Sequence, residues 1–164
     1  MALDLIAELE AVITALEREA IEYAVCGGLA LGLHGITRAT MDIDLLIRGE
    51  SLANAMQAVR GAGFDIPARK MVFGLQSGQR REMQRLSKLD ADTSELMAVD
   101  LLIVGPELEG VWADRVAMDV GGRHIVVVSR TGLATMKRIA GRPQDLVDLA
   151  NLEGTSADDD SYEP

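Results

Sequence analysis

Two aspartates at positions 42 and 44 are the residues of this sequence whose type and spacing first suggest chemistry. They alternate with Ile43 in the run from Met41 to Ile47, whose apolar residues predict a β-strand. Successive side chains of a strand point to opposite faces, so both carboxylates should share one face, with their Cα atoms about 7 Å apart. Carboxylate oxygens are hard ligands that favour Mg²⁺ or Mn²⁺ over Zn²⁺. The pair therefore predicts a metal site.

A third carboxylate, Asp100, lies in the middle of the apolar run Leu96–Val104, which predicts a buried strand. A carboxylate is costly there unless it is paired, hydrogen-bonded or bound to metal. If this strand lies beside the first one, three carboxylates converge and can hold one or two ions. Two structural alternatives stay open: Asp42 and Asp44 could form the polar face of a half-exposed strand, and Asp100 could pair with an arginine.

A glycine turn precedes the aspartate pair. Gly27 and Gly28 follow the apolar run Tyr23–Cys26 and open a short helix that ends near Gly35. Backbone N–H groups at such a turn can bind phosphate, although glycines also end strands for purely steric reasons. Because the turn and the aspartates are separated by only a short helix, we expect a phosphate site and a metal site in one cleft.

The remaining elements must position these groups. Leu3, Ile6, Leu9, Ile13 and Leu16 share one face of a predicted amphipathic helix over residues 3–20. Further on, the pattern predicts a helix over 51–60, short strands over 71–75 and 83–86 joined at Ser77-Gly78, a hairpin over 116–128, and helices over 131–140 and 143–152. We expect one domain over residues 1–152 and a disordered acidic tail over 153–164.

Composition excludes several classes of protein. A net charge of −10 and a pI near 4.6 argue against a scaffold that wraps nucleic acid by neutralising phosphates. Cys26 is the only cysteine, which excludes an intramolecular disulfide and a thiolate metal cluster and indicates a reducing compartment. No signal peptide is evident, and no apolar stretch approaches the roughly 18 residues that span a bilayer. We therefore expect a cytoplasmic protein without a membrane partner.

These motifs resemble a known family. The run from Gly27-Gly28 to Asp42-Ile43-Asp44 is similar to the Gly-Gly/Ser…Asp-x-Asp signature of the polymerase-β-like nucleotidyltransferase superfamily. Lys137 and the later Arg142-x-x-Asp145-x-x-Asp148 resemble the last helices of the AbiEii-type proteins, which are toxins of bacterial toxin–antitoxin pairs. The resemblance spans residues 23–152. It implies an α/β nucleotidyltransferase fold with a mixed sheet flanked by helices.

The resemblance also implies roles for individual residues. Asp42, Asp44 and Asp100 would hold the catalytic metal, and Asp100 would also activate the attacking hydroxyl. Gly27 and Gly28 would present N–H groups to the triphosphate, whose phosphates Lys137 would reach. The family's frequent serine is replaced here by Gly28, so one hydroxyl contact to phosphate is missing.

The implied reaction moves a nucleoside monophosphate from a nucleoside triphosphate (NTP) to a hydroxyl of RNA, a protein or a small molecule, and the implied partner is an antitoxin protein. In such a transfer the metal ions neutralise charge on the attacking and departing oxygens while the protein mostly positions the reactants. Two other functions remain open. The chain could be a binding or regulatory module that has lost turnover, as Gly28 and the lack of a C-terminal helical domain suggest, or an antibiotic-modifying nucleotidyltransferase.

For several charged residues, the sequence allows either a structural or a functional role. Arg38 could contact phosphate or pair with the carboxylates. Arg142 and Asp145 are spaced as an i,i+3 pair, with Asp148 one turn further on, and all three read as structural. His34 and His124 also read as structural, because no second histidine lies near either one. The basic segment 70–88 is either a solvated face or, if it borders the cleft, a region that steers a triphosphate or an RNA end toward the carboxylates.

Overall fold

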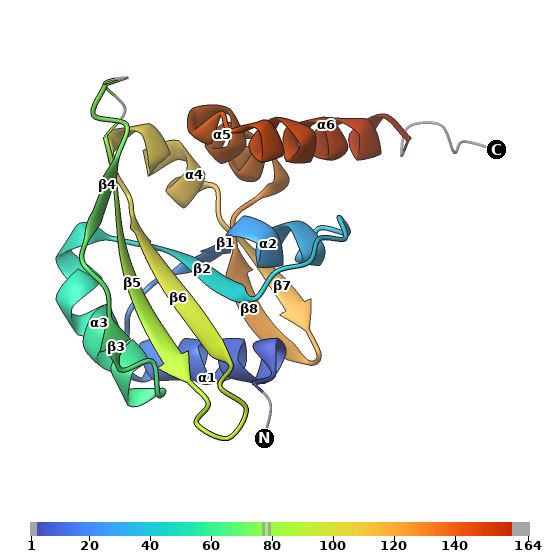
Figure 1. Cartoon of the computed structure of the whole chain (residues 1–164). Helices are drawn as coiled ribbons and strands as arrows, with labels where there is room; N and C mark the ends of the chain where they lie inside the picture. Colours follow the sequence, from blue (N-terminus) through green and yellow to red (C-terminus); the bar gives the residue numbers. More distant parts are fainter. Residues whose placement is uncertain (1–2, 77, 79, 159–164) are drawn as a thin grey trace.

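One mixed β-sheet forms the centre of the molecule (Figure 1). The computed structural model describes residues 3–76, 78 and 80–158. The sheet has eight strands in the order β3-β5-β6-β2-β1-β8-β7, and β4 pairs with β5. The strands are β1 Ala24–Cys26, β2 Asp42–Ile47, β3 Ile66–Pro67, β4 Met71–Phe73, β5 Arg81–Leu89, β6 Leu96–Ile103, β7 Val116–Val120 and β8 Arg123–Val127.

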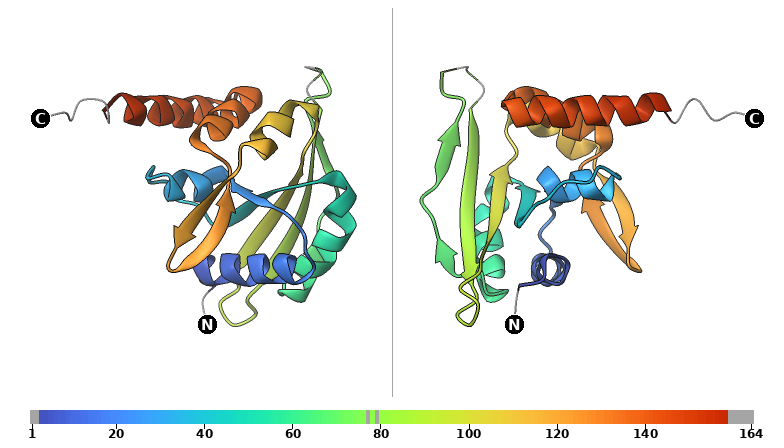
Figure 2. Two further views of the ribbon diagram at one scale, coloured as in Figure 1. Left: turned by 180° about the vertical axis from the view of Figure 1, so that it is seen from behind. Right: turned by 45° about the vertical axis from the view of Figure 1, so that its right-hand side comes forward.

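Helices flank this sheet, which confirms the predicted fold class. They are α1 Leu5–Arg18, α2 Gly27–Leu33, α3 Leu52–Gly61, α4 Glu109–Ala113, α5 Arg130–Ala140 and α6 Pro143–Asp158, with single 3₁₀ turns at Gly49–Ser51 and Pro106–Leu108. Helices α1 and α3 lie near one end of the strands, whereas α5 and α6 lie together at the other end of the molecule (Figure 2). The active-site candidates lie between the sheet and α5–α6.

Helix α1 begins at a side-chain cap and buries one face. The carboxylate of Asp4 accepts a hydrogen bond from the backbone N–H of Ala7, as expected of an N-cap. The face buried against the sheet consists of Leu9, Val12, Ile13 and Leu16. Ile6, which we predicted on that face, lies in the first turn of the helix and is 44% exposed instead, whereas Val12 is buried.

The three central strands contribute to the hydrophobic core, and two of them bring the predicted aspartates side by side. Apolar side chains of β1 and β2 are buried, and so are those in the middle of β6, as in strands covered on both faces. Strand β2 pairs with β6 in parallel, and Asp44 is in register with Asp100. The predicted neighbourhood of the two aspartate-bearing strands is therefore confirmed.

Strand β5 differs most from the sequence-based expectation. We predicted a short strand over 83–86, but β5 runs for nine residues and pairs with β6 along seven of them. Its sequence, Arg-Glu-Met-Gln-Arg-Leu-Ser-Lys-Leu, contains no β-branched or aromatic residue, so local propensity is weak and pairing with β6 decides its conformation. The predicted turn between the two strands includes Ser77, which lies outside the described residues.

The C-terminal helices form an antiparallel pair. Helix α5 ends at Gly141, whose φ of 63° is the left-handed conformation common after a helix. Helix α6 continues to Asp158, beyond the predicted end at residue 152, and Glu153 pairs with Arg138 of α5 at 2.6 Å. Residues 159–164 of the predicted tail lie outside the described residues. Within the described chain, no helix is both long enough and apolar enough to cross a bilayer.

Candidate active site

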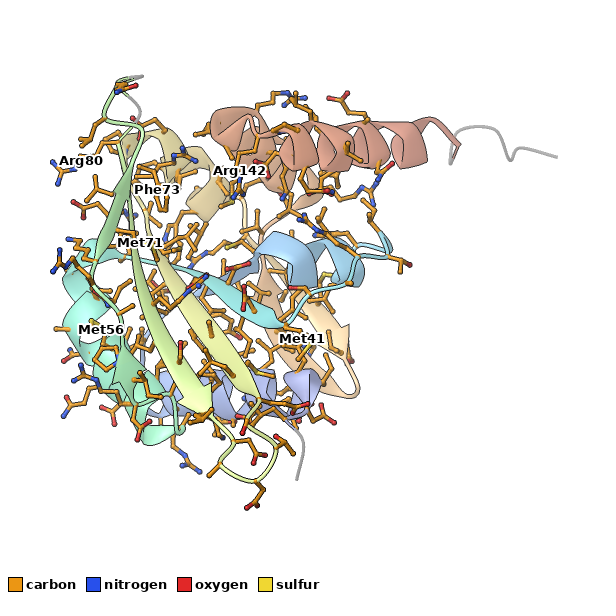
Figure 3. The ribbon with its side chains drawn as sticks, in the orientation of Figure 1. Met41, Met56, Met71, Phe73, Arg80 and Arg142 are labelled. Atoms are coloured by element: carbon orange, nitrogen blue, oxygen red, sulfur yellow. The ribbon has the colours of Figure 1, made fainter. Side chains whose placement is uncertain are left out.

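A cleft of about 830 Å³ lies between the sheet and helices α2 and α5–α6. This volume is within the range of small-molecule sites, roughly 300–1,000 Å³. Arg142, which directly precedes α6, faces Met71 and Phe73 of β4 across it (Figure 3). The apolar part of the lining consists mainly of Met71, Phe73, Met83, Leu102, Leu133 and Met136. All the residues predicted for the site line this cleft.

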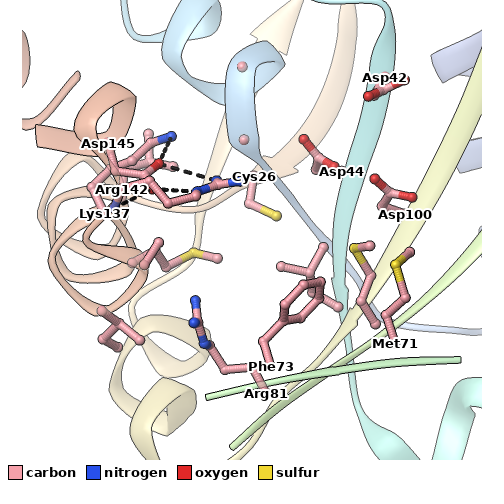
Figure 4. A pocket seen from close by; sticks show the side chains of 18 of the residues that line it. Cys26, Asp42, Asp44, Met71, Phe73, Arg81, Asp100, Lys137, Arg142 and Asp145 are labelled. Carbon is pink, nitrogen blue, oxygen red and sulfur yellow. Dashed lines mark hydrogen bonds and ion pairs between the residues drawn. The ribbon is translucent and has the colours of Figure 1, made fainter. Parts of the chain in front are cut away.

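The structure brings the three predicted carboxylates together on one wall (Figure 4). The pKa of Asp44 is raised to about 7, first by burial and then by the negative charges of Asp100 and Asp42. Asp42 is more open to solvent, with 49% of its side chain exposed. The wall therefore concentrates more negative charge than its surroundings offset, which favours a bound cation.

Arg85 of β5 lines the cleft, and sequence reasoning placed it only in the basic segment 70–88, without assigning it as the partner of Asp100. Its Nε and Nη2 atoms donate to the two carboxylate oxygens of Asp100 at 2.7 and 2.8 Å, and Nη2 lies 3.9 Å from Asp42. This bidentate pair is the arginine alternative that we considered for Asp100. It raises the pKa of the Arg85 guanidinium, mainly through the hydrogen bonds to Asp100. The spacing gave no local signal, because the contact depends on the register of β5 against β6.

The carboxylates suit a divalent ion in their chemistry but not yet in their arrangement. Three oxygen-donor side chains, two of them at i and i+2 of one strand, are a donor set for Mg²⁺ or Mn²⁺. Within the described residues, however, no three acidic, histidine or cysteine side chains are already arranged to hold an ion. In addition, both oxygens of Asp100 accept hydrogen bonds from Arg85. Ligation of an ion by Asp100 would require its pair with Arg85 to open.

Removing the guanidinium should make metal binding tighter. We expect Arg85→Gln to bind Mn²⁺ about tenfold more tightly than wild type, because the carboxylate oxygens no longer have a competing cation. Titration followed by Mn²⁺ electron paramagnetic resonance measures this directly. Arg80→Gln is the control, because Arg80 pairs with Glu82 and its side chain is 63% exposed. Unchanged or weaker Mn²⁺ binding by Arg85→Gln would show that the pair does not compete with the ion.

Close packing explains both glycines of the turn. Gly27 has a φ of 65°, and a Cβ atom there would lie 2.0 Å from Oδ2 of Asp44. A Cβ atom on Gly28 would lie 2.9 Å from Cβ of Thr40 and 3.1 Å from its Oγ1. The serine common at this position in the superfamily would therefore collide with Thr40, whose own hydroxyl lies close to the space that serine would use.

Gly27→Ala should disturb the fold and the site together. The methyl group meets the Asp44 carboxylate and the backbone is left-handed, so we expect a loss of about 2–4 kcal/mol in the free energy of unfolding. Urea denaturation followed by circular dichroism measures it. Gly121→Ala is a matched control for the backbone strain alone, because Gly121 has a φ of 61° and nothing lies within 4 Å of its added Cβ. Equal losses in both variants would mean that the contact with Asp44 is unimportant.

Lys137, which we predicted to contact phosphate, lines the cleft and is paired there with two carboxylates. Its Nζ lies 3.0 Å from Asp148 and 3.2 Å from Asp145, and its side chain is only 10% exposed. Both carboxylates belong to α6, so the lysine ties α5 to α6. Any contact between Lys137 and a triphosphate requires these pairs to rearrange.

The other ambiguous residues complete this structural network. Arg38 hydrogen-bonds to Asp148 of α6, which is the ion-pair alternative with a different carboxylate from those of β2. Arg142 pairs with Asp145 at 2.7 Å, as the i,i+3 spacing predicted. His34 ends α2, and its Nε2 lies 2.8 Å from the carbonyl oxygen of Val128, which supports its structural interpretation.

Comparison with known proteins decides the family. Residues 8–152 match the aminoglycoside-2''-adenylyltransferase family. The chain belongs to this family. The predicted enzyme class, a nucleotidyltransferase, is thereby confirmed, whereas a specific relation to AbiEii-type proteins is not shown. A search of curated sequences found no match.

Solved structures of low sequence identity share the fold of this adenylyltransferase-family chain. A Thermotoga maritima protein provisionally described as a nucleotidyltransferase is 14% identical, with a TM-score of 0.59 and 92% of each chain covered. ANT(2'')-Ia, solved with adenylyl-2''-tobramycin, is 16% identical, with a TM-score of 0.56 and coverage of 92% of this chain and 88% of that one. JHP933 from Helicobacter pylori is 18% identical, with a TM-score of 0.52 and coverage of 90% and 64%.

Proposed function

We propose that this protein transfers a nucleoside monophosphate from an NTP to a hydroxyl group in a metal-dependent reaction. The observation that carries the proposal is the register of Asp44 with Asp100, which places three carboxylates on the wall of a cleft that begins at the Gly27-Gly28 turn. Membership of an adenylyltransferase family makes ATP the first nucleotide to test.

The residues of the chain have distinct parts in this reaction. An ion held by Asp42, Asp44 and Asp100 would neutralise charge on the reacting oxygens. Asp100, released from Arg85, accepts the proton of the attacking hydroxyl. The hydroxyl oxygen forms a bond to the α-phosphorus while the bond to the departing pyrophosphate breaks. Backbone N–H groups of Gly27 and Gly28 hold the triphosphate, and the walls of the cleft position both substrates.

The acceptor defines two candidate roles. Family membership favours a small-molecule acceptor such as an aminoglycoside, and with it an antibiotic-modifying role. A toxin role, with RNA or protein as the acceptor and an antitoxin as partner, is supported by the resemblance of Lys137 and Arg142-x-x-Asp145-x-x-Asp148 to the AbiEii-type proteins. A toxin should arrest growth when expressed alone and be neutralised by the product of an adjacent gene, whereas an antibiotic-modifying enzyme should raise the resistance of a sensitive host.

A direct assay tests the proposal. The purified protein is incubated with Mg²⁺ or Mn²⁺, each of four α-³²P-labelled NTPs, and tobramycin, total RNA or cellular protein in separate reactions. We expect label on one class of acceptor and none when EDTA is added. No transfer to any acceptor, together with no binding of NTP by calorimetry, would contradict the proposal and favour the module that has lost turnover.

A further inference from the structure

Arg81 is the cation of the cleft that lacks an anionic partner within the described residues. Five basic side chains line the cleft, and four of them are paired with carboxylates. These four are Arg38 with Asp148, Arg85 with Asp100, Lys137 with Asp145 and Asp148, and Arg142 with Asp145. Among the residues that the structure describes, Arg81 forms no such pair. A charge left unpaired inside a cleft is a candidate ligand contact.

The Arg81 side chain lies in the cleft, but one of its hydrogen-bond donors has no acceptor there among the described residues. Its Nε is buried and has no hydrogen-bond acceptor among the described residues. The adjacent carboxylate, Glu82, is already bound by Lys70 at 2.9 Å and Arg80 at 2.8 Å. Figure 4 shows the Arg81 side chain extending from the sheet into the cleft beside Phe73, its cross-strand neighbour. Buried polar groups are normally hydrogen-bonded, so this arrangement indicates a missing partner.

The sheet register places Arg81 away from the glycine turn. Along β5, Arg85 and Arg81 share one face, and Arg85 is in register with Asp100. Arg81 lies four residues before Arg85 in β5, about 13 Å away along the strand. In β1, Cys26 is in register with Asp44, and the chain continues from Cys26 into the glycine turn. Because β1 and β5 run in the same direction, the glycine turn and Arg81 lie on opposite sides of Asp44 along the strands. The carboxylates therefore lie between the glycine turn and Arg81.

We propose that Arg81 binds a phosphate group of the acceptor. This inference rests on the proposed function and narrows it to an acceptor that carries a phosphate. If the departing pyrophosphate is held at the glycine turn and the α-phosphorus lies at the carboxylates, in-line attack brings the acceptor hydroxyl from the side of Arg81. The phosphate at Arg81 therefore belongs to the second substrate. An unpaired guanidinium repels a polycation and forms strong, bidentate hydrogen bonds with phosphate. The phosphate is either a phosphodiester of a nucleic acid or the phosphate of a small hydroxyl compound.

Arg81→Gln tests the proposal, with Arg80→Gln as the matched control. Arg80 is the neighbouring residue, carries the same charge, lies outside the cleft lining and points away from it (Figure 3). The two acceptor probes are a short oligoribonucleotide with a free 3′-hydroxyl and ribose 5-phosphate, with ribose and tobramycin as uncharged and polycationic comparisons. Calorimetry measures each affinity separately from the affinity for ATP.

We expect wild type to bind at least one phosphate-bearing probe and to bind ribose and tobramycin more weakly. Arg81→Gln should weaken binding of that probe about tenfold or more and leave ATP affinity within about twofold, whereas Arg80→Gln changes neither. Binding of the oligoribonucleotide by wild type should also depend more steeply on salt than binding by Arg81→Gln. Which probe responds identifies the source of the phosphate. If Arg81→Gln does not fold, Arg81→Lys is compared instead and should retain part of the affinity.

Three outcomes would overturn the inference. One is an equal loss of ATP affinity in Arg81→Gln, which would place Arg81 at the triphosphate. Another is unchanged binding of both phosphate-bearing probes, and the third is transfer to tobramycin with full efficiency in wild type and Arg81→Gln alike. In each of these outcomes ATP still binds or nucleotidyl transfer still occurs. Failure of the proposed function looks different, because neither nucleotide binding nor transfer is then found in wild type.

Discussion

Asp44→Asn should abolish nucleotidyl transfer while making the metal-free protein more stable at neutral pH. Asp44 is in register with Asp100, on the wall of the cleft that holds the three carboxylates. Loss of a charged ligand there should lower the transfer rate by at least about 10³-fold. The labelled-NTP assay measures this loss. The gain in stability arises because ionised Asp44 is buried beside two other carboxylates.

The pH dependence of the stability follows from the raised pKa of Asp44. In the folded protein this pKa is about 7, raised chiefly by burial and by the charges of Asp100 and Asp42. An unfolded aspartate titrates near pH 3.9, so between these values the folded state holds a proton that the unfolded state has lost. Stability should therefore fall as the pH rises from about 4 to about 7, by a few kcal/mol at most, and remain low above pH 7.

Thermal unfolding in EDTA between pH 4 and pH 8 measures this contribution in wild type and Asp44→Asn. The variant should lack the decline that Asp44 causes and should unfold at a higher temperature at pH 7.5. Asp42→Asn is the control, since the Asp42 side chain is 49% exposed and should lose activity without a comparable gain in stability. A variant that keeps its transfer activity, or is less stable than wild type at pH 7.5, would contradict the assignment.

Lys137→Met should destabilise the protein by about 3–5 kcal/mol, the range expected when one partner of a buried ion pair is removed. The change leaves Asp145 and Asp148 without their lysine, and the side chains of these aspartates are 1% and 4% exposed. Methionine retains most of the length and apolar volume of lysine, so the loss reports the charge. The free energy of unfolding is obtained from urea denaturation at pH 7.

A neighbouring residue of α5 supplies the control for Lys137. Arg138 pairs with Glu153, but both side chains are more than half exposed, so Arg138→Met should change the stability by less than about 1 kcal/mol. If Lys137→Met is as stable as Arg138→Met, the lysine does not hold α5 against α6 and its predicted role as a phosphate ligand gains support.

Sequence reasoning succeeded where the signal is local. The alternation of Asp42 and Asp44 with Ile43 follows from the two-residue period of a strand, and an apolar run of nine residues is enough to predict the strand of Asp100. It failed for β5, because that strand has little intrinsic propensity. The partner of Asp100 was missed for this reason: Arg85 belongs to the poorly predicted strand and reaches Asp100 only through the β5–β6 register.

The sequence by itself therefore determined the carboxylates, the glycine turn and the α/β class, because backbone geometry over a few residues dictates each of them. Only the tertiary structure decided which charges are paired. Arg38 and Asp148 are separated by 110 residues, and the partners of Lys137 depend on how α6 returns against α5. Ion pairing depends on distances between side chains that the chain brings together only on folding. For this reason, Lys137 is neutralised although its sequence context suggested a phosphate ligand, and Arg81 remains the cation of the cleft that, within the described residues, has no carboxylate partner.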